Sequence, residues 1–174
     1  MNNQAYIVMK LLRFIIPVIL LALILCTSCE PFEKVSDVPE IHFISYKTYW
    51  IDTLNFTVKA GELVFSFQDG NADFGLNNTV LNPDDTVNLF LIPYRKLDGA
   101  YEPIDESTYG RKYAIYNSEQ LIRTGQNKTI KGEIKVQIYY FLDPPYDTIR
   151  YDFYIVDRAK NESNVESTSD IGFP

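Results

Sequence analysis

The chain has 174 residues, and 16 Lys and Arg stand against 23 Asp and Glu, a formal net charge of −7. Because phosphate binding needs clustered Lys and Arg, this acidic balance predicts no nucleic-acid partner. One histidine and two cysteines exclude a zinc site built from several His or Cys ligands. The length suits one folded domain after a short N-terminal segment.

The N-terminal segment has the pattern of a secretion signal that ends at a lipid-attachment cysteine. Lys10 and Arg13 precede an apolar run that begins at Phe14, and small Thr27 and Ser28 stand directly before Cys29. The run is shorter than the roughly 20 residues that a membrane-spanning helix needs, which favours a signal peptide over an uncleaved anchor. We therefore expect a lipoprotein signal peptide at residues 1–28 and lipidation of Cys29.

Lipidation would set the chemistry of the mature chain. It would hold the protein on a membrane, at about 0.8 kcal/mol per buried methylene, and leave no free thiol for disulfides or catalysis. Loss of Lys10 and Arg13 with the signal would lower the formal charge from −7 to −9. Residues 29–40, with Pro31, Pro39 and several charges, predict a tether.

Alternation of apolar and polar side chains dominates residues 41–174 and predicts half-buried strands. Four segments carry the pattern: Leu63–Phe67, Val87–Leu91, Ile134–Tyr140 and Ile149–Ile155. Further strands are expected at Glu40–Tyr46, Leu54–Lys59, Lys112–Tyr116 and Asn164–Asp170, about eight in all. We expect Asp143–Asp147 to close a hairpin between the two longest strands.

The regular spacing of short strands predicts the fold class. No stretch of helical length shows a 3.6-residue period after the signal, so crossover helices and a parallel sheet are not expected. We predict an all-β fold, an antiparallel immunoglobulin-like β-sandwich preceded by a lipoprotein signal peptide.

Two polar segments follow predicted strands. In Asp69–Gly75, the oxygen side chains of Asp69, Asn71 and Asp73 stand at alternate positions, an arrangement that can converge on calcium. The spacing is not that of an EF-hand, and a polar turn in which these side chains bond local amides is the favoured interpretation. Asp157–Asn164 also reads as a turn.

These segments carry a resemblance to a known family. Phe65, Phe67, Asp69–Asn71, Asp73, Gly75 and Leu76, then Asn88–Leu91 and the run from Asp157 to Asn164, resemble small immunoglobulin-like surface lipoproteins of Gram-negative bacteria. The family has Gly where Ala72 and Lys160 stand here. The resemblance implies an outer-membrane lipoprotein, on the periplasmic or cell-surface face, and supplies no catalytic residues.

The residues do not predict an enzyme. His42, the only histidine, lies in an alternating segment and no GxSxG motif accompanies a serine, so a Ser-His-Asp triad is not expected. A carboxylate pair of a glycoside hydrolase stays open as a distant alternative, because only the distance between the two groups would reveal it.

Aromatic residues are abundant, at 14% of the chain. Tyr46, Tyr49 and Trp50 cluster in one segment, and exposed rings of this kind stack on sugars or contact protein partners. The alternative is that they cover the faces of a sheet.

Three triplets of Asp, Thr and an aliphatic residue place threonines at Thr53, Thr86 and Thr148. They resemble acceptors of periplasmic O-glycosylation, although Asp followed by Thr is also an ordinary entry to a strand.

Together these patterns favour a non-enzymatic, lipid-anchored protein of the cell envelope that binds a partner or serves as a structural accessory. A carbohydrate-binding surface lipoprotein that serves glycan uptake is the second hypothesis. No cofactor is expected other than possible calcium, and the partners are the membrane and a glycan or envelope protein.

Overall fold

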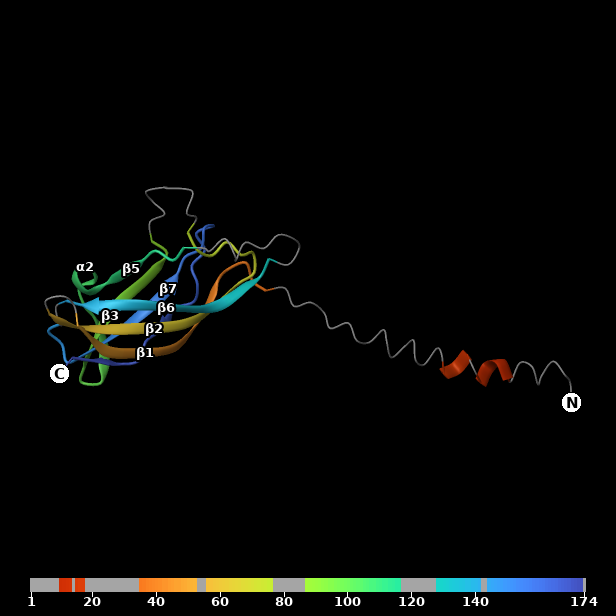
Figure 1. The fold of residues 1–174 in the computed structure, drawn as a ribbon, viewed down its shortest axis with the longest axis horizontal. Coiled ribbons are helices and arrows are strands. Elements are labelled where there is room, and N and C mark those ends of the chain that lie inside the picture. The colour runs from red at the N-terminus through yellow and green to blue at the C-terminus, as the bar shows by residue number, and fades with distance from the viewer. Residues whose placement is uncertain are drawn as a thin grey trace, which may run out of the picture. The chain divides into compact units, whose positions relative to one another are not determined.

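The computed structural model describes residues 10–13, 15–17, 35–52, 56–76, 87–116, 128–141 and 144–173 (Figure 1). The chain divides into two compact units, Met1–Lys34 and Val35–Pro174. In the first unit, residues 10–13 and 15–17 are helical. No helix in the described part of the chain is both long and apolar enough to span a bilayer. Cys29 lies outside the described residues.

The second unit contains a three-stranded antiparallel sheet in the order β1-β2-β6. Its strands are β1 (Glu40–Asp52), β2 (Thr57–Asp69) and β6 (Ile130–Tyr140). The register between β1 and β2 shifts between Phe43 and Ser45, so β1 contains a bulge. β2 is the central strand, which leaves β1 and β6 as the two edges of this sheet.

A six-stranded antiparallel sheet forms the other layer, with β3 and β7 paired at its centre. Its strands are β3 (Leu89–Leu97), β4 (Ala100–Pro103), β5 (Arg111–Tyr113), β7 (Thr148–Ile155), β8 (Glu166–Ser167) and β9 (Ile171–Gly172). β4 and β5 pair with different parts of β3 on the same side. The four-residue helix α2 (Glu106–Tyr109) connects β4 to β5.

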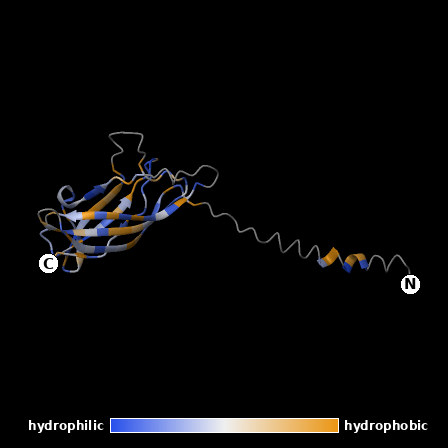
Figure 2. Ribbon diagram, in the orientation of Figure 1, coloured by the Kyte–Doolittle hydropathy of each residue, from blue (hydrophilic) through white to orange (hydrophobic). Residues whose placement is uncertain are grey.

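The core lies between the two sheets, and most of its strand residues stand at alternate positions of β2, β3, β6 and β7. Figure 2 shows hydrophobic and polar positions alternating along the strands of this domain. Phe65 of β2 packs on Phe153 of β7 with ring centroids 5.3 Å apart, and Phe43 meets the same ring edge-on at 6.4 Å. In β7, Ile149, Tyr151, Phe153 and Ile155 are buried while the residues between them are half-buried. Alternation therefore predicted the buried face of this strand correctly.

The prediction of an all-β, antiparallel fold is confirmed. The expected hairpin at Asp143–Asp147 is wrong, because the strands on either side of it, β6 and β7, belong to different sheets. Alternation could not separate these possibilities, since strands of both layers turn an apolar face to the same core. The two longest strands are β1 and β2, which pair with each other.

The bounds of several strands also differ from those expected. The predicted Leu63–Phe67 strand and residues 57–59 of the predicted Leu54–Lys59 strand belong to one continuous strand, β2. Small Ala60 and Gly61 do not interrupt β2, because pairing on both sides holds the central strand together. Asn164–Asp170 contains only the two-residue β8.

Candidate functional site

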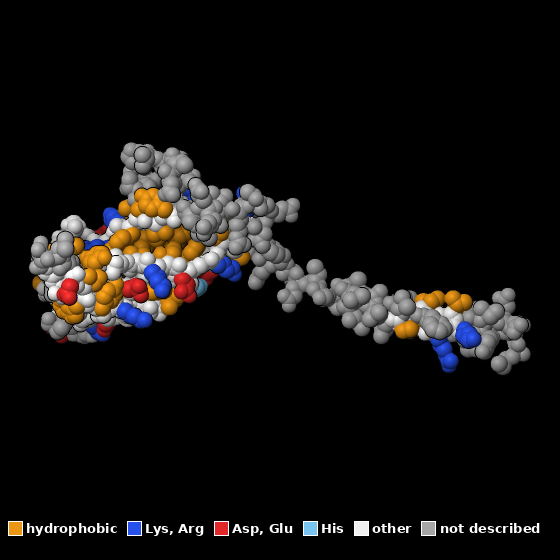
Figure 3. Space-filling view, viewed as in Figure 1, with side chains coloured by type: hydrophobic (Ala, Val, Ile, Leu, Met, Phe, Trp, Pro, Cys, Tyr) orange, Lys and Arg blue, Asp and Glu red, His pale blue; other side chains and the backbone are white. Residues whose placement is uncertain are grey.

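A cleft of about 520 Å³ opens where the edge strand β6 faces α2 and β5 of the other sheet. Figure 3 shows hydrophobic side chains gathered over the region where Figure 1 places β5 and β6. The volume of the cleft lies in the range of small-molecule sites, roughly 300–1,000 Å³. Its lining residues are Thr108, Tyr109, Arg111, Tyr113, Gln137, Tyr139 and Phe141.

Aromatic rings form the β6 side of the cleft. Tyr139 and Phe141 are 39% and 69% exposed, and their rings stack with centroids 6.0 Å apart and planes 26° apart. They alternate with Ile138 and Tyr140, which are buried in the core. Tyr139, on β6, and Phe141, directly after it, are therefore exposed on one side of a segment whose other side is anchored in the core.

Gln137 is held in one orientation by two tyrosines. Its Nε2 donates to the Tyr49 hydroxyl at 2.7 Å, and its Oε1 accepts from the Tyr139 hydroxyl at 2.6 Å. These bonds fix which end of the amide faces which neighbour. The contact also connects Tyr49 of β1 to the lining of the cleft across the outer face of the sheet.

Arg111 supplies the positive charge of the cleft. Its Nη1 donates to the carbonyl oxygens of Thr108, at 3.3 Å, and Gly110, at 3.0 Å. Burial raises the pKa of the neighbouring Tyr113 to about 12, and the Arg111 charge opposes that rise. The Tyr113 phenol is therefore neutral at physiological pH and does not offset the Arg111 charge.

Three tyrosines of the core and its margin lie near the lining residue Tyr109 or are joined to one another by hydrogen bonds. The hydroxyls of Tyr46 and Tyr140 are 2.5 Å apart, and the Tyr151 hydroxyl donates to the carbonyl of Tyr109 at 3.4 Å. Burial raises the pKa of all three phenols. They therefore remain neutral at physiological pH.

The structure does not bring Tyr46, Tyr49 and Trp50 together as one cluster. Tyr46 packs against the core, while Tyr49 bonds to Gln137. Trp50 is 64% exposed and, as the next residue of β1, faces away from the side that Tyr49 occupies. Of the three residues, Tyr49 alone contacts a residue that lines the cleft.

The cleft residues of α2, β5 and β6 were not identified from the sequence. The available signal was the alternate spacing of Gln137, Tyr139 and Phe141, which puts them on one face and Ile138 and Tyr140 on the other. No pattern in the sequence predicts that Arg111 lies near these residues, because local spacing does not show that β5 is opposite the β6 edge.

The Asp69–Gly75 loop is organised as a turn around a buried carboxylate. Asp69 is fully buried and accepts from the amides of Phe74 at 2.7 Å and Asn71 at 3.4 Å. The Asn71 side chain accepts from the Asp73 amide at 3.0 Å. Burial raises the pKa of Asp69 and, together with the negative charges of Asp157 and Asp69, raises that of Asp73 to about 6.

Arg158 joins this loop to the second polar segment. Its guanidinium donates to the carbonyls of Gly75 at 2.8 Å and Ala72 at 3.2 Å. Both Ala72 and Lys160 have positive φ, at 59° and 71°. In the residues that the structure describes, no group of three or more His, Cys, Asp or Glu side chains is arranged to hold a metal ion. The carboxylate oxygens of Asp69 instead serve backbone amides.

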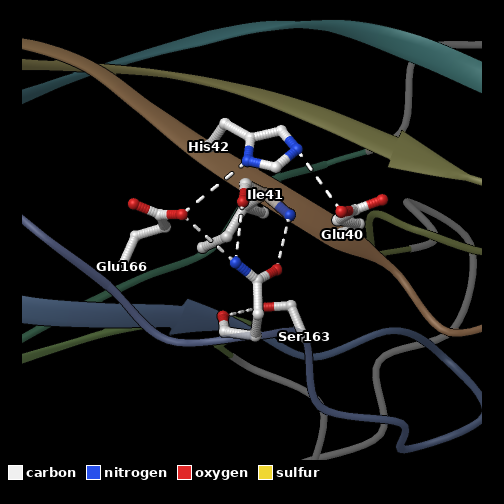
Figure 4. Close-up of polar contacts among 6 residues, drawn as sticks. Glu40, Ile41, His42, Ser163 and Glu166 are labelled. Atoms are coloured by element: carbon white, nitrogen blue, oxygen red, sulfur yellow. Dashed lines mark hydrogen bonds and ion pairs between the residues drawn. The ribbon is translucent and has the colours of Figure 1, made fainter.

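His42 lies on β1 beside two carboxylates (Figure 4). Its Nε2 is 3.4 Å from Glu40 and its Nδ1 is 3.7 Å from Glu166. Below it, the Asn164 side chain bonds the Ile41 backbone at both the N–H and the C=O, each at 2.8 Å. Asn164 thus pairs with the edge of β1 as a neighbouring strand would.

The candidate glycosylation sites are only partly described. Thr148 is half-buried at the start of β7, where it pairs with Gly172 of β9. Thr53 and Thr86 lie outside the described residues.

Comparisons of the chain with protein-family models, curated proteins and solved structures found no match. The function is therefore inferred from the chemistry of the cleft and from the sequence.

Proposed function

We propose that this protein is a lipid-anchored, non-enzymatic binding module of the bacterial outer membrane, and that the cleft between β5 and β6 binds a glycan. The domain would be an immunoglobulin-like sandwich held to the membrane through Cys29 after removal of residues 1–28. The observation that carries the proposal is the cleft itself, a concave site with exposed rings and fixed polar groups at the edge of two packed sheets.

The chemistry of the lining suits a sugar. A pyranose ring has apolar C–H faces that stack on aromatic rings, and Tyr139 and Phe141 offer such faces side by side. The ring also carries hydroxyls around its rim, for which Gln137, Thr108 and the tyrosine hydroxyls supply donors and acceptors. An aromatic base with a few oriented polar groups is the usual composition of a small-molecule site.

A glycan array probed with the full-length protein in detergent tests this function. Binding to a defined set of oligosaccharides is expected, and Tyr139→Ala should reduce it at least tenfold. Trp50→Ala is the matched control, because Trp50 is an exposed aromatic residue that faces away from Tyr49. Absence of any array signal, or equal losses in the two variants, would reject a glycan site in the cleft.

Lipid attachment is tested separately, by labelling cells with a palmitate analogue. The label is expected on the wild-type protein and on Cys26→Ser, which changes the other cysteine of the chain, and its loss is expected in Cys29→Ser. Persistence of the label in Cys29→Ser would reject the anchor.

A further inference from the structure

The charge within the cleft distinguishes among possible sugars. Arg111 is the only charged residue among the described residues that line it. The net charge of the chain is −7, so the basic residue in the cleft does not follow from a generally basic composition.

The ionic groups that neighbour Arg111 along the chain, in and next to α2 and β5, are already engaged. Asp105 accepts from the side chains of Ser107 and Thr108, and Glu106 faces Lys112 at 3.9 Å. Elsewhere on the same sheet, Arg95 pairs with Glu102 at 2.6 Å and Arg150 with Asp152 at 3.1 Å. No such ion pair is formed by Arg111 within the described part of the domain, where its hydrogen bonds go to backbone carbonyls.

Those two carbonyl bonds fix the position of the guanidinium without neutralising it. Both use Nη1, so the N–H groups of Nε and Nη2 remain as donors. A guanidinium presents its donors in a planar fork that matches the two oxygens of a carboxylate, which makes the pair geometrically specific. Arg111, which lines the cleft together with Tyr139 and Phe141, thus keeps a pair of donors of the kind that a planar anion accepts.

We propose that the cleft binds a carboxylate-bearing sugar, a hexuronate unit within an oligosaccharide. The Arg111 guanidinium receives the carboxylate, and Tyr139 and Phe141 stack on the sugar. This inference rests on the proposed glycan-binding function and adds to it the charge of the ligand.

The test compares ligands that differ only in charge. Isothermal titration of the full-length protein in detergent would use oligogalacturonate and oligoglucuronate, each beside its methyl ester, which keeps the ring and removes the negative charge. A hydrogen bond to a charged group contributes about 1.5–3 kcal/mol, so the acids should bind roughly 10- to 100-fold more tightly than their esters.

Variants assign the difference to one side chain. Arg111→Gln should abolish the preference, so that acid and ester bind this variant with equal affinity, whereas Arg111→Lys should retain part of the preference. Lys112→Gln is the matched control, since it removes the same charge one residue away, where the side chain is exposed and does not line the cleft. Should Arg111→Gln not fold, the comparison of acid with ester in the wild-type protein remains decisive.

The outcomes separate the two proposals. Equal affinity for acid and ester overturns the inference that the ligand is acidic, and an acid preference that survives in Arg111→Gln overturns the role of Arg111 in receiving the carboxylate. Either result leaves the glycan-binding function standing. Failure of the acids to bind, together with array binding of neutral sugars, has the same meaning. Absence of all binding, on the array and by titration, rejects both.

Discussion

Replacing Asp73 with asparagine is expected to stabilise the domain near neutral pH and to have little effect in acid. Asp73 Oδ1 is buried and has no hydrogen-bond partner in the described structure. Burial, followed by the negative charges of Asp157 and Asp69, raises the pKa of this carboxyl from 3.8 to about 6, although Arg158 acts in the opposite direction. The folded protein therefore disfavours the ionised form of Asp73 relative to the unfolded chain, and ionisation of this carboxyl lowers the stability of the fold.

The sign and size follow from proton linkage. Because the folded-state pKa is raised, the contribution of Asp73 is most favourable below about pH 3.8 and is lost as the pH rises through about 6. The full pKa difference corresponds to about 3 kcal/mol. Asp73 is only partly buried, so solvent screening reduces the expected gain in Asp73→Asn to about 1–2 kcal/mol.

Urea unfolding followed by tyrosine and tryptophan fluorescence measures this gain at about pH 7.5 and about pH 3.5. The variant should be more stable than wild type at the higher pH, and the two should differ by less than about 0.5 kcal/mol at the lower pH. Destabilisation at neutral pH, or an effect of the same size at both values, would refute the electrostatic reasoning.

The same titrations address the calcium alternative for Asp69, Asn71 and Asp73. A calcium ion in the loop would favour ionised Asp73, so millimolar calcium would raise the stability of the wild type and remove the advantage of Asp73→Asn. Identical unfolding midpoints in calcium and in chelator would exclude a stabilising ion.

Three further substitutions test local features by urea unfolding. Ala72→Gly should stabilise the domain by about 0.5–1 kcal/mol, because Ala72 has positive φ; a loss of stability would contradict the strain. Gly70→Ala should lower the free energy of unfolding by about 2 kcal/mol or more, because the added methyl group would collide with the backbone of the segment that precedes β1. Gly172→Ala is the control, since a methyl group there contacts nothing within 4 Å. Similar effects of the two substitutions would refute the steric argument. Asn164→Ala should cost about 1–3 kcal/mol through loss of both bonds to Ile41, and an unchanged midpoint would show that the edge of β1 does not need this pairing.

Much of the fold was predictable because burial imposes a two-residue period on strands such as β7, of which one face is buried. The spacing of Tyr151 and Phe153 identifies the buried face of β7, and it does so without knowledge of the neighbouring strands. The identity of the strand with which each strand pairs cannot be predicted in this way. Leu89 pairs with Ile155, far along the chain, and no local property of either segment specifies that pairing.

The candidate site was less predictable for the same reason. Alternation alone places Tyr49 on the opposite face from Tyr46 and Trp50, so their proximity in sequence was a poor guide to a shared surface. The cleft brings Arg111 of β5 to Tyr139 of β6 only after both sheets have packed. Sites formed by the edges of two layers depend on tertiary structure, which residue spacing does not encode.

The central pairing of β3 with β7 has a consequence for how the chain folds. β1 and β2 are adjacent in sequence and can close early, but β7 must find β3 across a long intervening segment that includes β4, β5 and β6. Closing such loops is entropically costly, and domains dominated by distant pairings fold in milliseconds to seconds. Until β7 arrives, the apolar faces of the β1–β2 hairpin and β6 lack their opposite layer, and the incomplete chain is exposed to aggregation.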